Sequence, residues 1–323
     1  MPEQGDSRGS PSVWVGIPTY NRAATLPRAI ESVLLQTHSE LELVISDNAS
    51  SDATREICER YANADARVRY LRQGVNRGPT ANFNTLFQEC RGDYVLMLSD
   101  DDWLDLDYVE RCLSEFAHTN GHTLVCGLAR LYEDGEHVID GVEMQLAQTT
   151  GPARVLAYFS KVRDNSAFYG VISREALQRA APLLNVLAND WLLVAAIAYQ
   201  GTVCTLPGTG VNRSLGGTSK DTATTAATFG KPTLQARIPH LVMAWHTFAQ
   251  LGWRACPYDD LPVRRRLVLG ARCALLVIDW TSLAWHMTAP PMASLRRRPR
   301  GRPPARAYFA LTRRLGAGRQ RYF

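Results

Sequence analysis

The feature that most constrains the fold is a regular alternation of short apolar runs and helical segments between Val13 and Cys126. The apolar runs have the length of β-strands, and the segments between them repeat apolar residues with a helical period. This alternation is typical of a parallel β-sheet covered by helices. The predicted strands are Val13–Ile17, Leu41–Ser46, Val68–Leu71 and Tyr94–Leu98.

The remainder of the chain is less regular. In the region from about Leu124 to Thr205 we expect short strands at Thr123–Cys126 and Phe168–Ile172 and helices that begin at Arg174 and Asp190. A linker rich in threonine and alanine follows Asp221 and leads to two predicted helices, Leu234–Leu251 and Val263–His286. The chain has 323 residues, of which 46% are hydrophobic and 21% charged, and this fits one large domain or two small ones.

The second C-terminal helix and the tail after it differ from the rest in charge. Arg265, Arg272, Asp279 and His286 recur every seven residues as one narrow polar stripe on an otherwise apolar helix, so we expect the helix to be largely covered. Beyond Pro290 there are ten arginines and no acids, so 26 basic and 31 acidic residues remain before it. Such a tail is expected to be flexible; it either attracts anionic lipid, nucleic acid or an acidic partner, or is simply solvated.

Targeting signals and cysteine motifs are not evident. No run of about 18 apolar residues predicts a membrane-spanning helix, and the first twelve residues lack the apolar core of a secretory signal. Seven scattered cysteines without C-x-x-C spacing indicate reduced, mostly buried thiols. We therefore expect a cytoplasmic protein.

Polar residues follow each of the four predicted strands. They are PTYN, SDNAS, NRG and SDDDW in chain order. In a parallel sheet the carboxyl ends of the strands meet at one edge, where ligands bind. The sequence therefore predicts a functional site at this edge.

The acidic run Asp100–Asp102 is the strongest single feature of that edge. Adjacent carboxylates repel one another, and a divalent cation such as Mg²⁺ or Mn²⁺ would neutralise them and bridge two phosphates of a nucleotide. The alternative is that Asp102 or Asp105 caps the helix carrying Val109 and Leu113.

The glycine-rich phosphate loops of P-loop and dinucleotide-binding proteins are missing from this sequence. Other side chains at the strand ends have the right chemistry for a nucleotide. Tyr20 can stack on a base, Asp47 can accept a hydrogen bond from a base N–H, and Arg77 can neutralise a phosphate. Each also has a simpler interpretation, as core rim, turn former and surface charge respectively.

These motifs together resemble family 2 glycosyltransferases of the GT-A fold, from about Ser12 to Gly217. The matching stretches are IPTYNRAATLPRAIESVLLQT, LVISDNASSDAT, NRGPTANFN, GDYVLMLSDDDWL and NDWLL. The resemblance implies a Rossmann-like, mixed but mainly parallel sheet flanked by helices, here with a helical C-terminal extension. It also implies transfer of a sugar from a nucleoside-diphosphate donor, with inversion at the anomeric carbon.

The resemblance assigns roles to individual residues. The nucleoside pocket would be lined by Pro18, Thr19, Tyr20 and Asp47. Asn76 and Arg77 would lie near the base and diphosphate, and Asp100 would reach the ribose. Asp101 would hold the metal on the donor phosphates.

Asp190 falls where the family places its catalytic base. A carboxylate there would take a proton from the acceptor hydroxyl as its oxygen attacks the anomeric carbon. Asp190 also fits as the N-cap of a helix from Trp191 to Tyr199, and the two roles are compatible.

Three positions depart from the family pattern. Ser99 replaces an acid often found two residues before the metal ligand, so metal dependence is less certain. Leu215 replaces the histidine of an Arg-x-His-Gly-Gly motif, whose Arg213 is retained for the donor site. Asn48 replaces a second acid after the second strand, which is a milder change.

The sequence leaves several functional alternatives. A sugar-phosphate nucleotidyltransferase would need a glycine-rich loop after the first strand, which Pro18–Asn21 is not. A non-catalytic nucleotide-sugar-binding module is the main alternative to the enzyme. The C-terminal region could dock on an anionic membrane, form a homo-oligomer interface or cover the acceptor.

The expected organisation is a flexible N-terminus (1–12), a GT-A domain (13–221), a helical C-terminal region (222–290) and a basic tail (291–323). The expected acceptor is a saccharide, a lipid-linked molecule or a small molecule, and no specific nucleic acid is expected. Peripheral association with the inner membrane face would accompany a lipid-linked acceptor.

Overall fold

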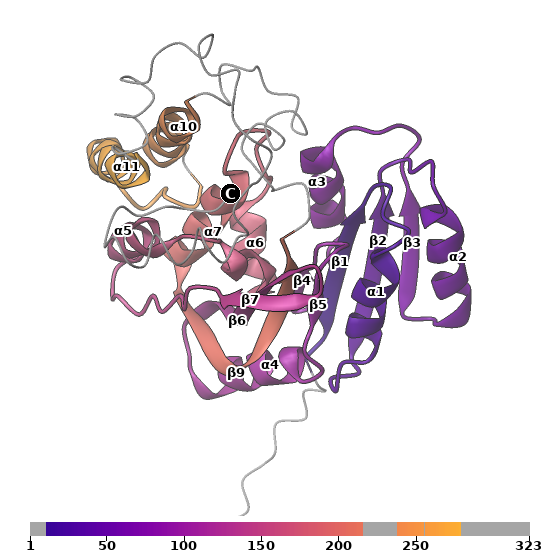
Figure 1. Cartoon of the computed structure of the whole chain (residues 1–323). Helices are drawn as coiled ribbons and strands as arrows, with labels where there is room; N and C mark the ends of the chain where they lie inside the picture. The colour runs from indigo at the N-terminus through magenta and orange to yellow at the C-terminus, as the bar shows by residue number, and fades with distance from the viewer. Residues whose placement is uncertain (1–10, 216–237, 255, 279–323) are drawn as a thin grey trace, which may run out of the picture.

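The computed structural model describes residues 11–215, 238–254 and 256–278 (Figure 1). The predicted flexible N-terminus through residue 10, the linker after Asp221 and the arginine tail lie outside these residues. No helix among the described segments is long and apolar enough to cross a membrane.

The described strands form one mixed sheet in the order β3-β2-β1-β4-β8-β6-β9-β5, with β7 paired to β6. The strands are β1 Val13–Thr19, β2 Leu41–Asp47, β3 Val68–Arg72, β4 Tyr94–Met97, β5 Trp103–Leu104, β6 His122–Glu133, β7 Glu136–Asp140, β8 Val171–Ser173 and β9 Thr202–Ser214. The first four strands are parallel, and β8 joins them antiparallel to β4. In the second half, β6 and β9 run parallel to each other, and β5 pairs antiparallel with β9.

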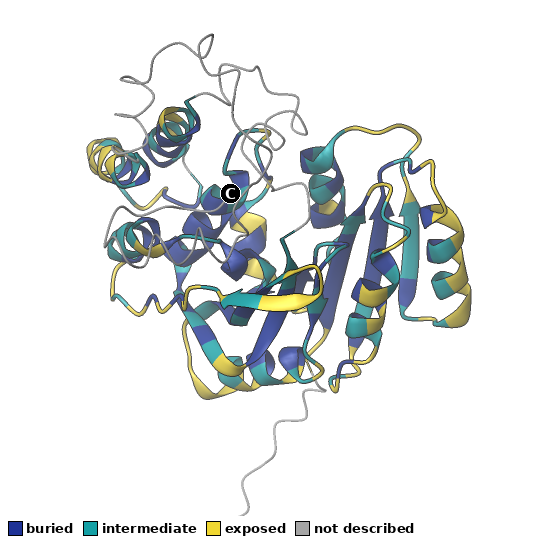
Figure 2. Cartoon of the chain, viewed as in Figure 1, coloured by how far each residue is buried: buried dark blue, intermediate teal, exposed yellow. Residues whose placement is uncertain are grey.

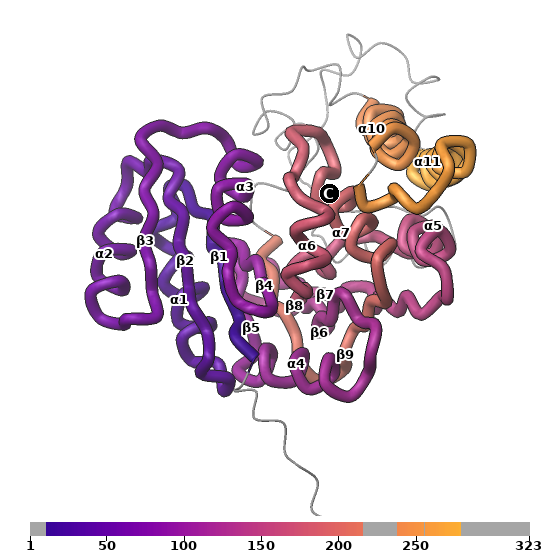
Figure 3. Tube along the Cα trace, turned by 180° about the vertical axis from the view of Figure 1, so that it is seen from behind, coloured from indigo at the N-terminus to yellow at the C-terminus, as the bar shows by residue number. Residues whose placement is uncertain are grey.

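Helices cover both faces of the sheet (Figures 1 and 3). They are α1 Leu26–Leu34, α2 Thr54–Ala64, α3 Pro79–Glu89, α4 Tyr108–His118, α5 Gly151–Lys161, the 3₁₀ turn η1 Ser166–Tyr169, α6 Arg174–Ala180, α7 Asn189–Gln200, α10 Pro239–Trp253 and α11 Val263–Val277. Alternation along β1 explains the two layers, because Val13, Val15 and Ile17 face the α1 and α4 side while Trp14 faces α3. The predicted α/β architecture is confirmed.

The structure corrects two details of the predicted elements. Phe168 lies in η1, and the strand starts only at Val171. Neither Asp102 nor Asp105 caps α4, because its N-cap is Asp107. The N-cap of α2 is Ala53, and the Asp52 carboxylate accepts a hydrogen bond from the Thr54 N–H at 3.0 Å.

The C-terminal helices also differ from expectation. Helix α10 begins at Pro239, and residues 234–237 of its predicted start lie outside the described part. Helix α11 buries Leu269, Cys273 and Val277 but leaves Val268 and Leu275 more than half exposed, so one face only is covered within the described chain (Figure 2). Asp279 and His286 of its predicted polar stripe lie outside the described residues.

The cysteines are free thiols, as the sequence predicts. Four of them are buried: Cys58, Cys112, Cys126 and Cys273.

Candidate active site

The carboxyl ends of β1, β2 and β3 lie side by side, as the sequence predicts for a parallel sheet. Thr19 pairs with Asp47, and Asp47 pairs in turn with Arg72. The Asp47 carboxylate is fully buried, and its Oδ1 accepts a hydrogen bond from the Ser50 N–H at 2.8 Å. Its Oδ2 accepts hydrogen bonds from the Arg72 guanidinium at 2.7 Å and from the Tyr70 hydroxyl at 2.8 Å. Both oxygens of Asp47 therefore hold the strand ends together. Tyr20, which follows the last residue of β1, is 43% exposed.

Asn48 connects the second strand end to the loop after the third. Its amide Nδ2 donates to Asn76 Oδ1 at 2.8 Å, and its Oδ1 accepts the Arg77 N–H at 2.9 Å. Asn76 Oδ1 also accepts the Gly78 N–H at 2.8 Å. A carboxylate at position 48 could not donate to Asn76, so the departure from the family pattern matches the loop that it supports. The Arg77 side chain is exposed at this edge.

The turn after β4 carries the acidic run and adjoins the ends of β1 and β9. The Ser99 hydroxyl donates to Asp101 Oδ1 at 2.6 Å. Arg22 lies on the other side, with Nε 3.5 Å from Asp100 Oδ1 and one terminal nitrogen 4.0 Å from Asp101 Oδ2. Serine at position 99 thus orients Asp101 by a hydrogen bond, and Arg22 supplies part of the positive charge that the cluster needs.

Burial dominates the electrostatics of the other two carboxyls in this run. Desolvation and the charge of Asp101 raise the pKa of Asp100 and of Asp102 to about 7. Arg22 partly offsets this increase in the pKa of Asp100, and Arg213 does so for Asp102. Burial disfavours the ionised form of these neighbouring carboxyl groups. A bound cation would stabilise that ionised form.

Arg213 ties the end of β9 to the acidic turn. Its Nε lies 3.4 Å from Asp102 Oδ2, while one terminal nitrogen donates to the carbonyl oxygen of Asp164 at 2.9 Å and to Ser166 Oγ at 3.0 Å. The following Ser214 N–H donates to Asp102 Oδ1 at 2.9 Å. Asp102 therefore serves as the anchor between the two halves of the sheet.

Asp190 approaches the same region from α7. It is the second residue of the helix, whose N-cap is Ala188 with a φ of 60°, so the predicted N-cap role of Asp190 is wrong. The Asn165 amide donates to Asp190 Oδ2 at 2.8 Å, and Asn165 itself accepts the Tyr158 hydroxyl at 2.6 Å. Burial raises the pKa of Asp190, and Asn165 and the charge of Arg213 oppose that rise.

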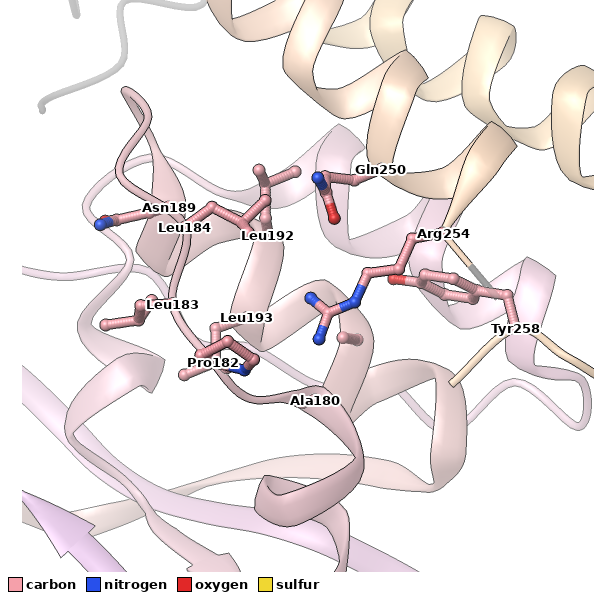
Figure 4. A pocket seen from close by; sticks show the side chains of 11 residues that line it. Ala180, Pro182, Leu183, Leu184, Asn189, Leu192, Leu193, Gln250, Arg254 and Tyr258 are labelled. Atoms are coloured by element: carbon pink, nitrogen blue, oxygen red, sulfur yellow. The ribbon is translucent and has the colours of Figure 1, made fainter. Parts of the chain in front are cut away.

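A small pocket lies between the α6–α7 connection, the start of α7 and the end of α10 (Figure 4). Its lining is mainly apolar, with Leu183 and Leu192 beside Gln250 and Arg254 of the C-terminal part. Arg254 donates to the carbonyl oxygen of Ala181 at 2.7 Å. The pocket marks the seam where α10 packs against the α6–α7 connection.

Among the predicted site residues, Pro18, Thr19, Tyr20, Asp47, Asn76 and Arg77 lie at the first three strand ends, Asp100 and Asp101 in the turn after β4, and Arg213 at the end of β9. Sequence reasoning missed Arg22, Arg28 and Asn165. Arg28 donates to the Asp101 carbonyl at 3.0 Å and lies 3.5 Å over the Trp103 ring. Arg22 and Arg28 fall inside the first matching stretch and their charge was a usable signal, whereas nothing near Asn165 pointed to Asp190.

Comparison with known proteins decides the family. The model of glycosyl transferase family 2 matches residues 14–180, more than half of the 323 residues. The chain belongs to glycosyl transferase family 2. Curated relatives include chondroitin synthase of Escherichia coli, 44% identical over 33% of this chain and 15% of that protein. GalNAc(5)-diNAcBac-PP-undecaprenol β-1,3-glucosyltransferase of Campylobacter jejuni is 32% identical over 36% of this chain and 39% of that protein.

Solved structures with similar architecture agree on the fold. The 1–349 part of TarS from S. aureus superposes with a TM-score of 0.62 at 15% identity, covering 87% of this chain and 76% of that one. Mannosyltransferase PcManGT from Pyrobaculum calidifontis, in complex with GDP-Man and Mn²⁺, gives 0.51 at 18% identity, covering 95% and 80%. The fold of this glycosyltransferase-family chain is therefore GT-A, as predicted. The chain spans less than half of the length of the curated relatives named above.

Proposed function

We propose that the protein is an inverting glycosyltransferase that moves a sugar from a nucleoside-diphosphate donor to an acceptor hydroxyl. The observation that carries the proposal is the convergence on Arg213: its guanidinium pairs with Asp102 beside Asp101, and its charge also acts on Asp190. A donor-side carboxylate and a base on a separate element are what a single displacement requires.

The donor side is assigned to the first three strand ends. Pro18, Thr19, Tyr20 and Asp47 would form the nucleoside pocket, with the exposed Tyr20 ring available for stacking. Because both oxygens of Asp47 already accept hydrogen bonds, a base N–H would share Oδ1 or Oδ2 with one of those donors. Asn76 and Arg77 would approach the base and diphosphate, and Asp100 the ribose.

A divalent metal, Mn²⁺ or Mg²⁺, fits the acidic turn. Asp101 Oδ1 accepts the Ser99 hydroxyl at 2.6 Å, whereas Oδ2 lies 4.0 Å from a terminal nitrogen of Arg22, so Oδ2 could bind the metal. Magnesium is commonly bound by one or two carboxylates together with substrate phosphates. When bound, such an ion would neutralise the charge on the departing diphosphate. TarS has been solved with UDP-GlcNAc and PcManGT with GDP-Man and Mn²⁺, which supports this donor class.

Asp190 is proposed as the general base. Its raised pKa makes the ionised carboxylate a better proton acceptor than an exposed aspartate, and the Asn165 hydrogen bond fixes one oxygen. Arg213 acts here as a positioning residue, because its side chain holds Asp102 and the 164–166 segment. A role of Arg213 on the donor diphosphate would add to these contacts.

The acceptor is proposed to be a saccharide, a lipid-linked molecule or a small molecule. An anionic membrane is the partner that the C-terminal helices favour. Trp245 and Trp253 on α10 are more than half exposed, and their ring centroids lie 5.6 Å apart, with Phe248 between them in the sequence. Exposed arginines lie on the neighbouring α11, including Arg264, Arg265 and Arg272. Clustered tryptophans beside basic residues match the interface of an anionic bilayer.

Sedimentation with anionic vesicles tests the membrane partner. We expect the full chain to pellet with the vesicles and the Trp245→Ala, Trp253→Ala double variant, or a chain ending at Pro290, to pellet less. Equal recovery of all three in the supernatant would refute it. A concentration-dependent doubling of mass that the double variant abolishes would assign the surface to a homo-oligomer instead.

Donor turnover tests the main proposal. The protein is incubated with UDP-, TDP-, GDP- and CDP-sugars, with Mn²⁺ or with chelator, and release of the nucleoside diphosphate is measured. We expect one nucleotide class to react, and the anomeric configuration of the transferred sugar to be opposite to that of the donor. Tight nucleotide binding without any release, over a broad acceptor panel, would favour the non-catalytic binding module.

A further inference from the structure

A second group of metal-ligating side chains lies at the opposite end of the β6–β9 pair from Asp102. Glu115 belongs to the last turn of α4, His122 is the first residue of β6, and Cys204 lies near the start of β9. One ligand atom of each residue lies within 4.8 Å of those of the other two. The β6–β9 register runs from the His122–Thr202 pair to the Tyr132–Ser214 pair, and the Ser214 N–H donates to Asp102, so this group and the acidic turn lie at opposite ends of the strand pair.

Neighbouring hydroxyls already orient two of the three side chains. His122 Nδ1 lies 2.8 Å from Thr202 Oγ1, which leaves Nε2 directed at Glu115 Oε1, 3.1 Å away. The Thr119 hydroxyl donates to the same Glu115 oxygen at 2.9 Å. Hydrogen bonds to the far nitrogen of a histidine and to a ligating carboxylate are the usual outer partners of a metal site. The His122 side chain is only 8% exposed, so the geometry is held by packing.

The donor set is selective for one class of ion. A thiolate, an imidazole and a carboxylate are zinc ligands, whereas Mg²⁺ and Mn²⁺ prefer oxygen alone. The group is therefore chemically distinct from Asp101 and would not compete for the metal of the donor site.

We propose that Glu115, His122 and Cys204 bind one zinc ion, with water in the fourth position. Zinc takes the place of the Nε2 proton of His122, which moves to Nδ1 and is donated to Thr202 Oγ1, and it displaces the thiol proton of Cys204, which is released to solvent. The ion links the end of α4 to the first residues of β6 and β9. It would stabilise the strand pair whose other end holds Asp102.

Cobalt substitution tests the site, because a thiolate bound to Co²⁺ gives a charge-transfer absorption that carboxylate and imidazole ligands do not. The full-length protein is freed of metal with a chelator, titrated with Co²⁺ and then with Zn²⁺. We expect one equivalent of Co²⁺ to produce the thiolate band and one equivalent of Zn²⁺ to abolish it. Zinc should also raise the melting temperature.

Four variants separate this site from others. Cys204→Ser should lose the band, His122→Gln should weaken zinc binding at least tenfold, and Cys90→Ser, a partly buried cysteine elsewhere, should behave as the wild type. Asp101→Asn should keep the band, because its metal is a different one. Absence of the band in the wild type, or its persistence in Cys204→Ser, would overturn the proposal and leave a Glu115–His122 hydrogen bond beside a thiol.

Discussion

The two halves of the sheet are built in different ways. In residues 13–97 the strands pair through β1, β2, β3 and β4, each connected by one covering helix, and all run parallel. In residues 98–215 the pairs join segments far apart in the chain, such as Trp103 with Asn212 and Cys126 with Thr205. The first half therefore carries the proposed nucleotide site in strand ends that local sequence patterns predict, and the second half supplies Asp190 and Arg213 through long-range contacts.

The largest expected effect is a loss of turnover on substitution of Asp190 in the second half, with nucleotide affinity in the first half unchanged. Asp190→Asn should lower turnover by a factor of roughly 10² to 10⁴, the usual contribution of a general base, while nucleotide affinity stays unchanged. Steady-state turnover and nucleotide titration measure the two quantities. Glu175→Gln is the matched control, since Glu175 occupies the first turn of α6 as Asp190 occupies that of α7. Equal turnover of Asp190→Asn and Glu175→Gln would contradict the assignment.

The next effect concerns the link between the halves. Arg213→Met leaves the buried Asp102 carboxyl without its charged partner, and breaking such a pair costs about 3–5 kcal/mol of unfolding free energy. Urea unfolding at neutral pH measures the change. The exposed Arg111–Asp107 pair provides a comparison, because Arg111→Met should change stability by no more than about 1 kcal/mol. Similar losses in both variants would show that Arg213 is not the link.

A smaller effect should appear in the pH dependence of turnover. Asp190 acts only when ionised, so its raised pKa makes activity fall as the pH decreases through that pKa. The hydrogen bond from Asn165 favours the ionised form, so Asn165→Gly, which suits the φ of 47° there, should move the acidic limb to higher pH.

Tyr158→Phe is the control for that shift. It removes the hydrogen bond to Asn165 without touching Asp190 directly, so its acidic limb should move less. An unchanged limb in Asn165→Gly would indicate that another group limits the rate at low pH.

The smallest effect lies within the first half. Asn48→Asp loses the donor to Asn76 and places a charge beside the loop that carries Arg77, so nucleotide affinity should fall a few-fold. Isothermal titration measures it. Asn185→Asp introduces the same charge on an exposed residue and should leave affinity unchanged. Equal affinity in the two variants would remove the loop from the donor site.

The same contrast explains what sequence reasoning could predict. The strands and helices of residues 13–97 follow from local periodicity and from glycine and proline positions. The acidic run directly follows a predicted strand, so its position at the edge of the sheet could also be predicted. The long β9 was missed because Pro207 and two glycines interrupt its pattern, and its pairing with β6 is set by tertiary contact. The partners of Asp190 and Asp102 depend on that pairing, so Asn165 and the anchoring role of Asp102 had no local signal.

Thermal unfolding of the wild type, Asp101→Asn and Asp190→Asn is measured with UDP, TDP, GDP and CDP, each with and without Mn²⁺. This experiment tests most directly whether Asp101 belongs to the nucleotide and metal site while Asp190 does not. The account predicts that one nucleotide stabilises the wild type only with metal, by about 2.7 kcal/mol at a concentration 100 times its Kd. Asp190→Asn should keep this stabilisation, and Asp101→Asn should lose it. Stabilisation that survives in Asp101→Asn, or none with any nucleotide, would contradict the assignment of the donor site.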